Sequence, residues 1–384
     1  MKKFSLTLLV MLSVFLMNDT LYAQFGFDWN ILGSGARARG MGGAFIGTAD
    51  DATAISWNPA GLVRLETPEA SLVGIFTARS YALKEPGQDE AVTLDDWNQS
   101  HFNLNFVSIA YPLSMGTTPL VGAIAYQRVI DMYEANSSED FGYNYESTGG
   151  IDAITPGFGI QLNPMFSVGA ALNIYLGKRT TKTEYVNSIQ PNEEYEYDWS
   201  GNNINIGLMA DFQTFRLGFV YKTPFDLHVK YKPVDGDESE GDYTMPGMLG
   251  IGAALNPVDN LTLAADIEIR NYSNVRIKQD DQETDPEWEN VTQLRLGAEY
   301  LLMSGTAVLP LRLGLKTEPK TYKDGKGDQV MGVAFTAGGG LIMGNLNFDL
   351  TGELGVATAE WQDGSELGEV TFNILASAVI HLGQ

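Results

Sequence analysis

The stretch Leu261-Thr-Leu-Ala-Ala-Asp-Ile-Glu-Ile-Arg270 decides the fold class of this chain. Apolar side chains recur at every second residue, and two carboxylates and an arginine occupy positions between them. A period of two places alternate side chains on opposite faces of a β-strand, whereas an amphipathic helix has a period of about 3.6. The stretch is therefore predicted to be a strand with one apolar face and one polar face.

The same alternation recurs along the chain beyond residue 67. Fourteen segments of this kind begin near Glu69, Phe102, Leu120, Ile151, Phe166, Asn203, Phe215, Met248, Leu261, Thr292, Leu311, Met331, Leu346 and Val370. An even number of strands lets a single-chain bacterial barrel close, and strands of about 9–11 residues cross a bilayer. We predict an all-β fold, namely a 14-stranded antiparallel transmembrane β-barrel in the bacterial outer membrane.

Short and long connections alternate between these segments. Turns of a few residues follow every second segment, at 114–118, 163–165, 213–214, 256–260, 304–306 and 344–345. Acidic residues concentrate between the other segments, at 83–100, 183–199 and 280–290. Outer-membrane barrels have short periplasmic turns and long external loops, so we expect these three stretches to be external loops. A large secreted β-sandwich is the alternative fold, but it offers no reason for sorting loops by length.

The net charge of −24 lies mainly in these acidic stretches. Nucleic-acid binding needs clustered Lys and Arg, so a nucleic-acid partner is excluded. Two interpretations of the acidic loops stay open. They are solvated loops that resist aggregation, or they recruit divalent cations that also bridge lipopolysaccharide.

The beginning of the chain has the three parts of a secretory signal peptide. Two lysines precede an apolar stretch from Phe4 to Met17, and Leu21-Tyr-Ala23 is a suitable cleavage site. The apolar stretch breaks at Asn18 and is shorter than the about 20 residues of a membrane-spanning helix. We therefore predict that residues 1–23 are a cleaved leader. The chain has no cysteine, which excludes disulfides, thiolate metal sites and cysteine nucleophiles.

The polar faces of the predicted strands carry charges of both signs, which we assign to the barrel lumen. The candidate lumen charges are Asp266, Glu268, Arg270, Arg295, Glu299, Arg312 and Lys316, with Arg128, Asp211, Arg216, Lys222, Asp349 and Glu353 at the same inward parity. Charges in a confined interior must be paired or hydrated. The lumen is therefore either an open aqueous pore or a plugged one.

A glycine-rich and charged segment precedes the first predicted strand and supplies a plug. It is too short to form a domain alone, so we predict that residues 24–62 are a hatch inside a barrel of residues 63–384. The residues expected to hold or gate the hatch are Arg37, Arg39, Gly42, Gly43, Asp50, Asp51, Asn58, Pro59 and Ala60.

Each residue type in this set has a physical role. The glycines allow the backbone to pass close to barrel side chains. Arg37 and Arg39 can pair with inward carboxylates such as Glu268 or Glu299. Asp50 or Asp51 can cap a short helix over residues 54–57, which Asn58-Pro59 then ends.

Asn58 has a further predicted role. Its amide can hydrogen-bond wall backbone that is exposed where a kink breaks a strand ladder. We expect Asn58 to bind the wall near a kinked strand and to help hold the passage shut. The alternative is that Asn-Pro merely terminates the helix.

The hatch segment also resembles a known family. Ala36-Arg-Ala-Arg-Gly-Met-Gly-Gly-Ala-Phe45, Ala49-Asp-Asp-Ala52 and Asn58-Pro-Ala-Gly-Leu62 are similar to the hatch signature of the FadL/TodX family of outer-membrane channels. Looser similarity continues through 219–224, 245–252 and 294–300. The resemblance implies a fourteen-stranded barrel with an N-terminal hatch and passive uptake of long-chain fatty acids or aromatic hydrocarbons. The chain departs from the family at its end, His381-Leu-Gly-Gln384, where a terminal aromatic residue is usual.

Together these features predict a monomeric channel for a hydrophobic small molecule or fatty acid, surrounded by outer-membrane lipid and lipopolysaccharide. The cargo is expected to adsorb among the outer loops, enter an apolar pocket above the hatch and leave through a lateral opening. Arg312 or Lys316 can hold a carboxylate head, and pairing within the lumen is the alternative. Barrels with a similar Asn-Pro-Ala hatch also serve in secretion systems, so the alternative function is a non-transporting barrel that docks protein partners.

Prolines within predicted strands are candidates for the lateral opening, because proline cannot donate to a strand ladder. Pro156, Pro224 and Pro246 lie in or beside such strands, and each is either a strand-end residue or a kink in the wall. No nucleophile elbow, P-loop or zinc-type His pair is present, so we predict no enzyme activity and no cofactor. His101 lies near two serines, but an exposed histidine at a loop edge is the simpler interpretation.

Overall fold

The computed structural model describes residues 32–88, 90–116, 118–138, 142–186, 191–233, 236–279 and 282–383. The predicted leader, residues 1–23, and the first part of the predicted hatch lie outside these residues. No helix within the described ranges is long and apolar enough to cross a membrane.

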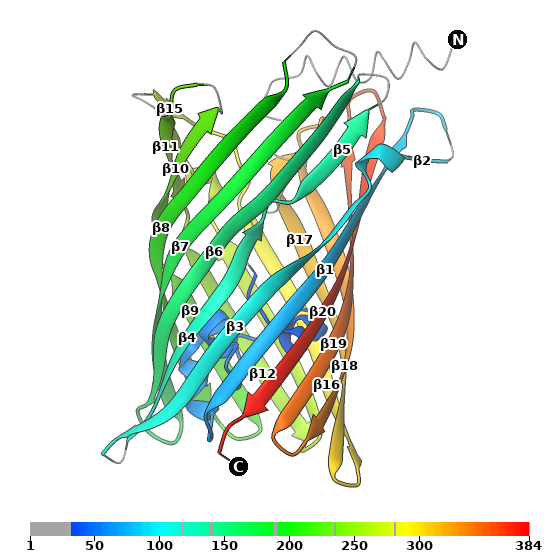
Figure 1. Ribbon diagram of the computed structural model, residues 1–384. Coiled ribbons are helices and arrows are strands. Elements are labelled where there is room, and N and C mark those ends of the chain that lie inside the picture. Colours follow the sequence, from blue (N-terminus) through cyan, green and yellow to red (C-terminus); the bar gives the residue numbers. More distant parts are fainter. Residues whose placement is uncertain are drawn as a thin grey trace.

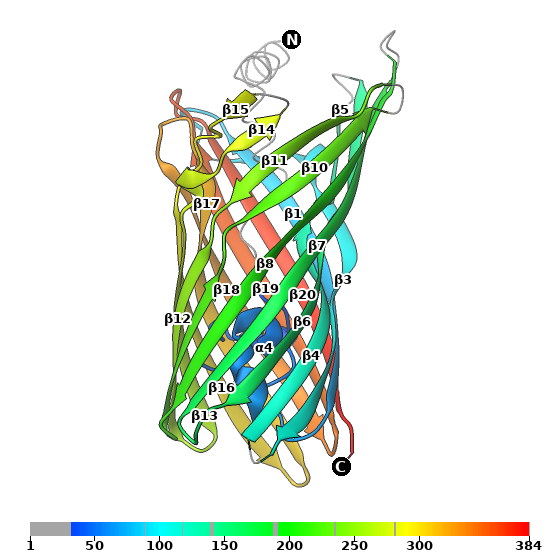
Figure 2. The same ribbon diagram turned by 90° about the vertical axis from the view of Figure 1, so that its left-hand side faces the viewer.

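Fourteen wall strands, counted over the described residues, form one closed antiparallel sheet (Figures 1 and 2). Closure is direct, because β1 pairs with β3 on one side and with β20 on the other. The wall strands are β1 (Glu69–Lys84), β3 (Gln99–Met115), β4 (Thr118–Asp131), β6 (Tyr143–Gln161), β7 (Phe166–Tyr185), β8 (Glu193–Asp211), β9 (Phe215–Lys222) continued by β10 (Phe225–Pro233), β11 (Ser239–Met245) continued by β12 (Met248–Val258), β13 (Leu261–Arg270), β16 (Val291–Ser304), β17 (Ala307–Lys323), β18 (Gln329–Met343), β19 (Leu346–Glu360) and β20 (Glu366–His381). The predicted fourteen-stranded barrel is confirmed.

Short elements complete the described chain. They are the helices α3 (Ala36–Gly40) and α4 (Ala54–Trp57), the 3-10 helices η1 (Pro59–Arg64), η2 (Asp95–Trp97) and η3 (Tyr272–Asn274), and the strands β2 (Val92–Thr93), β5 (Glu134–Ser138), β14 (Ile277–Gln279) and β15 (Gln282–Thr284). We call the barrel end with the short turns the turn end and the opposite end the loop end. Each predicted short turn joins two wall strands at the turn end.

The register of the sheet gathers the apolar faces on the outside of the barrel. One row runs across β16 to β20, because each residue pairs with the next: Leu296, Leu315, Phe335, Leu354 and Phe372. These side chains are 40–58% exposed. The residues beside them along each strand face inward, so a period of two along the chain becomes an apolar exterior and a polar interior.

One of the predicted acidic loops is largely strand. Residues 193–199 belong to β8, and 183–185 to β7, which leaves only a short connection between them. The stretch alternates, with Glu194, Glu196 and Asp198 on the outer face and tyrosine or tryptophan between them. The prediction of a loop was wrong because strand periodicity continues when the outer face is charged instead of apolar.

Residues 32–65, which we call the internal segment, lie inside the barrel toward the turn end (Figure 2). Helix α4 and the turn at Asn58-Pro59 form where predicted. The capping residue differs, because Thr53 is the N-cap and Asp51 instead accepts a hydrogen bond from the Thr53 N–H at 2.9 Å. Helix α3 was not predicted, since its glycine and alanine content gave no periodic signal.

All three singled-out prolines coincide with interruptions of a ladder. Pro224 separates β9 from β10, and Pro246 separates β11 from β12, so neighbouring strands break at the same level. Pro156 lies within β6, where the ladder to β7 skips residues 155 and 156. The side chains of Thr155 and Asn173 hydrogen-bond across that interruption at 2.9 Å.

Candidate functional site

Glycines in the wall seat the internal segment. Gly207 on β8 faces Asn58, and a Cβ at that glycine would lie 2.1 Å from Asn58 Oδ1. A Cβ at Gly314 on β17 would lie 2.0 Å from the Gly42 nitrogen. The register joins such glycines across neighbouring strands as Gly159–Gly169–Gly207, Gly218–Gly252 and Gly297–Gly314. Only glycine permits so close an approach of two backbones. We call these aligned wall glycines the glycine seat. It was not predicted from the sequence, although glycines at inward-facing positions of successive strands were a visible signal for it.

Glycines of the internal segment contact the same part of the wall. Gly42 and Gly43 have φ values of 65° and 74°, which favour glycine. The Gly42 N–H donates to Thr336 Oγ1 at 3.0 Å, and the Thr336 hydroxyl donates to the Gly40 carbonyl at 2.9 Å. The segment thus turns sharply while its backbone polar groups are satisfied by the wall.

Arg37 links the segment to the wall through charge. Its guanidinium donates to both oxygens of Glu299 on β16, at 3.0 and 2.9 Å, and this is one of the pairings expected from the sequence. It also contacts Asp50 and Asp51 within the segment. The same Glu299 carboxylate accepts a hydrogen bond from Arg312 Nε at 2.6 Å. Such a two-pronged arginine–carboxylate pair is both strong and geometrically specific.

Arg39 pairs with a wall carboxylate other than the predicted Glu268 or Glu299. It donates two hydrogen bonds to Glu353 on β19, at 3.0 and 2.5 Å, and only 8% of Arg39 is exposed. Lys316 Nζ approaches the same carboxylate at 3.1 Å. Glu268 is not available to Arg39, because Arg270 and Arg295 hold it.

The candidate lumen charges are all buried within the barrel and engaged around the segment. Asp266 accepts hydrogen bonds from the Phe45 and Ile46 N–H groups, at 2.7 and 2.8 Å. Arg312 and Lys316 are 3% and 1% exposed and are paired with wall carboxylates. Neither of these two cations lines the pocket described below. The geometry therefore places both in the internal network rather than at a cargo head group.

The adjacent aspartates Asp50 and Asp51 have opposite pKa directions. Burial acts to raise the pKa of Asp50, but the charges of Arg37 and Arg216 outweigh burial, so the pKa of Asp50 is lowered. Burial dominates at Asp51 and is reinforced by the charge of Asp50, so its pKa is raised despite Arg37. The surroundings therefore stabilise the ionised carboxylate of Asp50 and destabilise that of Asp51.

Asn58 is fully buried and uses both ends of its amide. Nδ2 donates to the carbonyls of Leu208 on β8, at 3.1 Å, and of Ile46, at 3.0 Å, while Oδ1 accepts from the Ala60 N–H. Strand β8 is continuous at this contact, and the break at Pro224 lies in the neighbouring strand. Asn58 therefore ties the segment to the wall, and its gating role remains a prediction.

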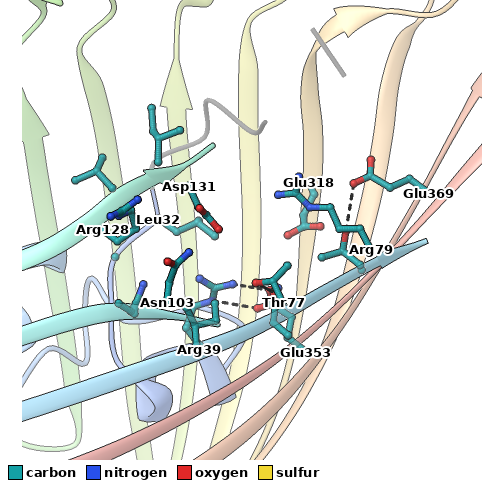
Figure 3. A pocket seen from close by; sticks show the side chains of 18 of the residues that line it. Leu32, Arg39, Thr77, Arg79, Asn103, Arg128, Asp131, Glu318, Glu353 and Glu369 are labelled. Carbon is teal, nitrogen blue, oxygen red and sulfur yellow. Dashed lines mark hydrogen bonds and ion pairs between the residues drawn. The ribbon is translucent and has the colours of Figure 1, made fainter. Parts of the chain in front are cut away.

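A pocket of about 170 Å³ lies on the loop-end side of the internal segment (Figure 3). Leu32, Gly33 and Arg39 contribute its floor, and β1, β3, β4, β17, β19 and β20 contribute its walls. Its charged lining consists of Arg39, Arg79, Arg128 and Lys320 with Asp131, Glu318, Glu353 and Glu369. This cavity is therefore polar and balanced in charge, and the expected apolar pocket above the internal segment stays a prediction.

A buried apolar cluster adjoins this pocket. Buried side chains from β4, β6, β7, β8, β10, β11, η3 and the connection before β16 form one cluster inside the barrel, which we call the aromatic cluster: Ile130, Ile151, Tyr175, Trp199, Leu227, Met245, Tyr272 and Trp288. Phe225, beside the break at Pro224, stacks on Tyr175 with ring centroids 4.8 Å apart. Ile130 belongs to the cluster and also lines the pocket, so polar and apolar surfaces adjoin there.

The wall beside the pocket is incomplete. Strands β3 and β4 pair from Met115–Thr118 up to Phe106–Gln127, and among the described residues no ladder pair joins them beyond that point. Toward the loop end, β3 pairs with β1 alone, whereas β4 and β5 pair with β6. Two strand edges, residues 99–105 and 128–138, therefore face each other without a ladder. We call this interruption the wall gap, and Asn103 and Arg128 on its edges line the pocket.

Comparisons with known proteins agree with this architecture. A family model described as BamG matches residues 1–234 of the chain. The structure is similar to that of a Pseudomonas aeruginosa FadL homologue, at a TM-score of 0.66 and 14% identity, covering 93% of this chain and 100% of that one. It is also similar to the Ralstonia pickettii toluene transporter TbuX, at a TM-score of 0.64 and 14% identity, covering 92% of this chain and 100% of that one. The P. putida toluene transporter TodX matches at a TM-score of 0.62 and 12% identity, again covering 92% of this chain and 100% of that one. Among the curated proteins, no match was found. The resemblance to the FadL/TodX family is confirmed at the level of the fold.

Proposed function

The chain belongs to the BamG family, and we propose that it is an outer-membrane channel through which hydrophobic compounds with a polar head pass from the pocket sideways into the membrane. The wall gap carries this proposal, because it places an interrupted ladder directly beside a cavity. The apolar outer face supports a membrane location. Leu104 and Phe102, on the edge of the gap, point outward and are 43% and 69% exposed.

Passage straight through the barrel is opposed by the internal segment. Its backbone is seated on wall glycines, a buried ion pair holds it to β19, and a partly buried ion pair holds it to β16. Breaking a buried, hydrogen-bonded charge pair such as Arg39–Glu353 costs about 3–5 kcal/mol, and the other contacts of the segment would have to break with it. We propose that the segment acts as a hatch that stays in place while cargo leaves above it.

The lining supports a cargo with two chemically different ends. Transfer of an apolar chain into contact with the aromatic cluster is favourable by about 0.8 kcal/mol per buried methylene. The charged pocket next to Ile130 suits a group that forms hydrogen bonds, since a bare hydrocarbon would leave those polar groups desolvated and unpaired. Long-chain fatty acids have this shape, and aromatic hydrocarbons lack the polar end.

The test uses two adjacent residues that face opposite sides of the same strand. Asn103→Trp fills the pocket beside the gap, whereas Phe102→Trp changes only the outer surface. Uptake of labelled fatty acids and of alkanes of equal length is measured in a deletion strain and in vesicles that contain each variant. Asn103→Trp should abolish most of the fatty-acid uptake, and Phe102→Trp should preserve it.

The same experiment can overturn the proposal. Uptake that is equal for wild type and deletion strain, or unaffected by Asn103→Trp, excludes transport through the gap. Stable co-purification of the transport-inactive barrel with periplasmic or secreted proteins would then favour the docking function.

A further inference from the structure

Contacts between side chains bridge the wall gap near its loop end. His101 Nε2 on β3 is in hydrogen-bond contact with Asp131 Oδ2 at the end of β4. The His101 ring also stacks on Tyr133, with centroids 4.2 Å apart and planes inclined by 27°. Two residues closer to the loop end on β3, Gln99 Oε1 accepts a hydrogen bond from the Ala135 N–H at 3.0 Å. His101 is thus in the wall and largely covered, with 13% of its side chain exposed, which contradicts the expected exposed loop histidine.

These contacts hold together two edges that lack any ladder. A ladder would supply a backbone hydrogen bond at alternate residues, and its absence leaves β3 and the β4–β5 connection free to separate. We infer that His101, Asp131 and Tyr133 form a clasp that controls the width of the wall gap, and that the clasp must release for cargo to pass. The inference rests on the proposed function, because it assigns the gate of the proposed lateral route.

Position and chemistry favour a gate over a purely structural contact. Asp131 and Asn103 both line the pocket (Figure 3), so the clasp borders the cavity at the edge of the wall gap. Behind it, Asn103 Nδ2 and Asn105 Oδ1 are buried without a hydrogen-bond partner in the described structure. Buried amides without partners are costly and are expected where a ligand or water supplies the missing bond. A polar cargo head that reaches these amides would lie immediately behind the clasp.

A second histidine provides a matched control. His228 Nδ1 lies 2.9 Å from Asp242 Oδ1, which reproduces the histidine–carboxylate chemistry of the clasp. His228 and Asp242, however, are partners in the continuous ladder of β10 and β11. Replacing His228 should therefore leave the wall closed, whereas replacing His101 should loosen it.

The experiment measures opening independently of cargo. The chain has no cysteine, so Asn103→Cys introduces a single thiol in the pocket beside the gap. The full-length protein in lipid vesicles is labelled with a maleimide that carries a long alkyl chain, and separately with a charged maleimide of similar size. Losing the clasp removes about 1–1.5 kcal/mol of hydrogen bonding, so His101→Ala should speed alkyl-maleimide labelling by roughly fivefold to tenfold. His228→Ala should leave it unchanged, and charged-maleimide labelling should change in neither variant.

Further variants keep the test decisive. Asp131→Asn removes only the charge of the clasp and should give a smaller increase, and Tyr133→Ala should remove the stack with the same direction of effect. Heat-modifiable gel migration confirms that each barrel has folded. Equal labelling rates in the His101, Asp131 and His228 variants would overturn the clasp. If Asn103→Trp blocks uptake while these rates stay equal, only the clasp is wrong; if Asn103→Trp leaves uptake intact, the proposed route itself fails.

Discussion

Phe106 on β3 and Gln127 on β4 form the last ladder pair before the wall gap, and Gln127 also donates a hydrogen bond to the Leu32 carbonyl at 2.8 Å. One residue thus marks both the bottom of the gap and the point where the internal segment reaches the pocket. The floor of the cavity and the base of the opening are at the same level. On the proposed route, a cargo stopped by the segment would leave sideways at this level.

Gly207 should not tolerate even one added carbon. Gly207→Ala places a methyl group against Asn58, so we expect the internal segment to detach and the folded barrel to lose stability by about 1–3 kcal/mol. Limited proteolysis near residue 58 and thermal unfolding in detergent measure these effects. Gly339→Ala is the control, because its nearest atom is 3.8 Å from the added Cβ. Equal protease resistance in the two variants would contradict the glycine seat.

Asn58→Ala should loosen the segment while leaving the barrel assembled. The substitution removes two donated hydrogen bonds and one accepted bond, of which the bonds with Ile46 and Ala60 are buried. The Leu208 carbonyl keeps its strand environment, so heat-modifiable migration should persist. We expect altered uptake of labelled fatty acid and faster proteolysis of the segment. Unchanged uptake, or failure of the barrel to assemble, would assign Asn58 a purely structural role.

Asp50 and Asp51 should respond to substitution with opposite signs. At neutral pH, Asp50→Asn loses a carboxylate that the folded state favours, so segment docking weakens. Asp51→Asn removes a carboxylate that burial disfavours and keeps the acceptor for Thr53, so docking strengthens. Thermal unfolding of the two variants at pH 7 checks the prediction. Shifts of the same sign in both variants would contradict it.

The same two groups define a pH dependence. Because the folded pKa of Asp51 is raised, its contribution to docking is fully present below its ordinary pKa of 3.8 and is lost as pH rises through the raised value. The lowered pKa of Asp50 works the other way: its contribution is present above 3.8 and is lost as pH falls through the lowered value. Protection of the segment from proteolysis, followed from pH 7 downward with an acid-stable protease, should therefore increase in wild type before it decreases. In Asp51→Asn the initial increase should be smaller than in wild type.

Arg39→Gln should open the floor of the pocket. The substitution removes two hydrogen bonds to Glu353, whereas Lys316 still neutralises that carboxylate. The barrel should therefore fold, and ion conductance through single channels in planar bilayers should rise above the wild-type level. Lys326→Gln, which removes a pair with Glu360 at the loop end, is the control and should conduct like wild type. Equal conductance in wild type and Arg39→Gln would show that Arg39 does not seal the floor.

Much of the wall was predictable, and the parts that were not have a common cause. The alternation at Leu261–Arg270 and its thirteen counterparts located every wall strand, because an apolar exterior and a crowded polar interior impose the period directly on the sequence. The boundaries were less accurate where the environment changes along a strand. Beyond the apolar band, β8 carries charge outside and aromatic rings inside, so the sequence pattern predicts a loop over its first seven residues, 193–199.

The sequence by itself determined the strand count, the alternating turns, the helix at Ala54–Trp57 and the inward charges, since each depends on neighbours along the chain. Only the tertiary structure decided that Arg39 pairs with Glu353, that glycines from separate strands align into one seat, and that β3 and β4 part above Phe106. These relationships join residues from different strands, and they depend on the register in which the strands pair. A shift of one residue in a single strand would exchange its inner and outer faces, so sequence periodicity identifies the faces while register decides which side chains meet.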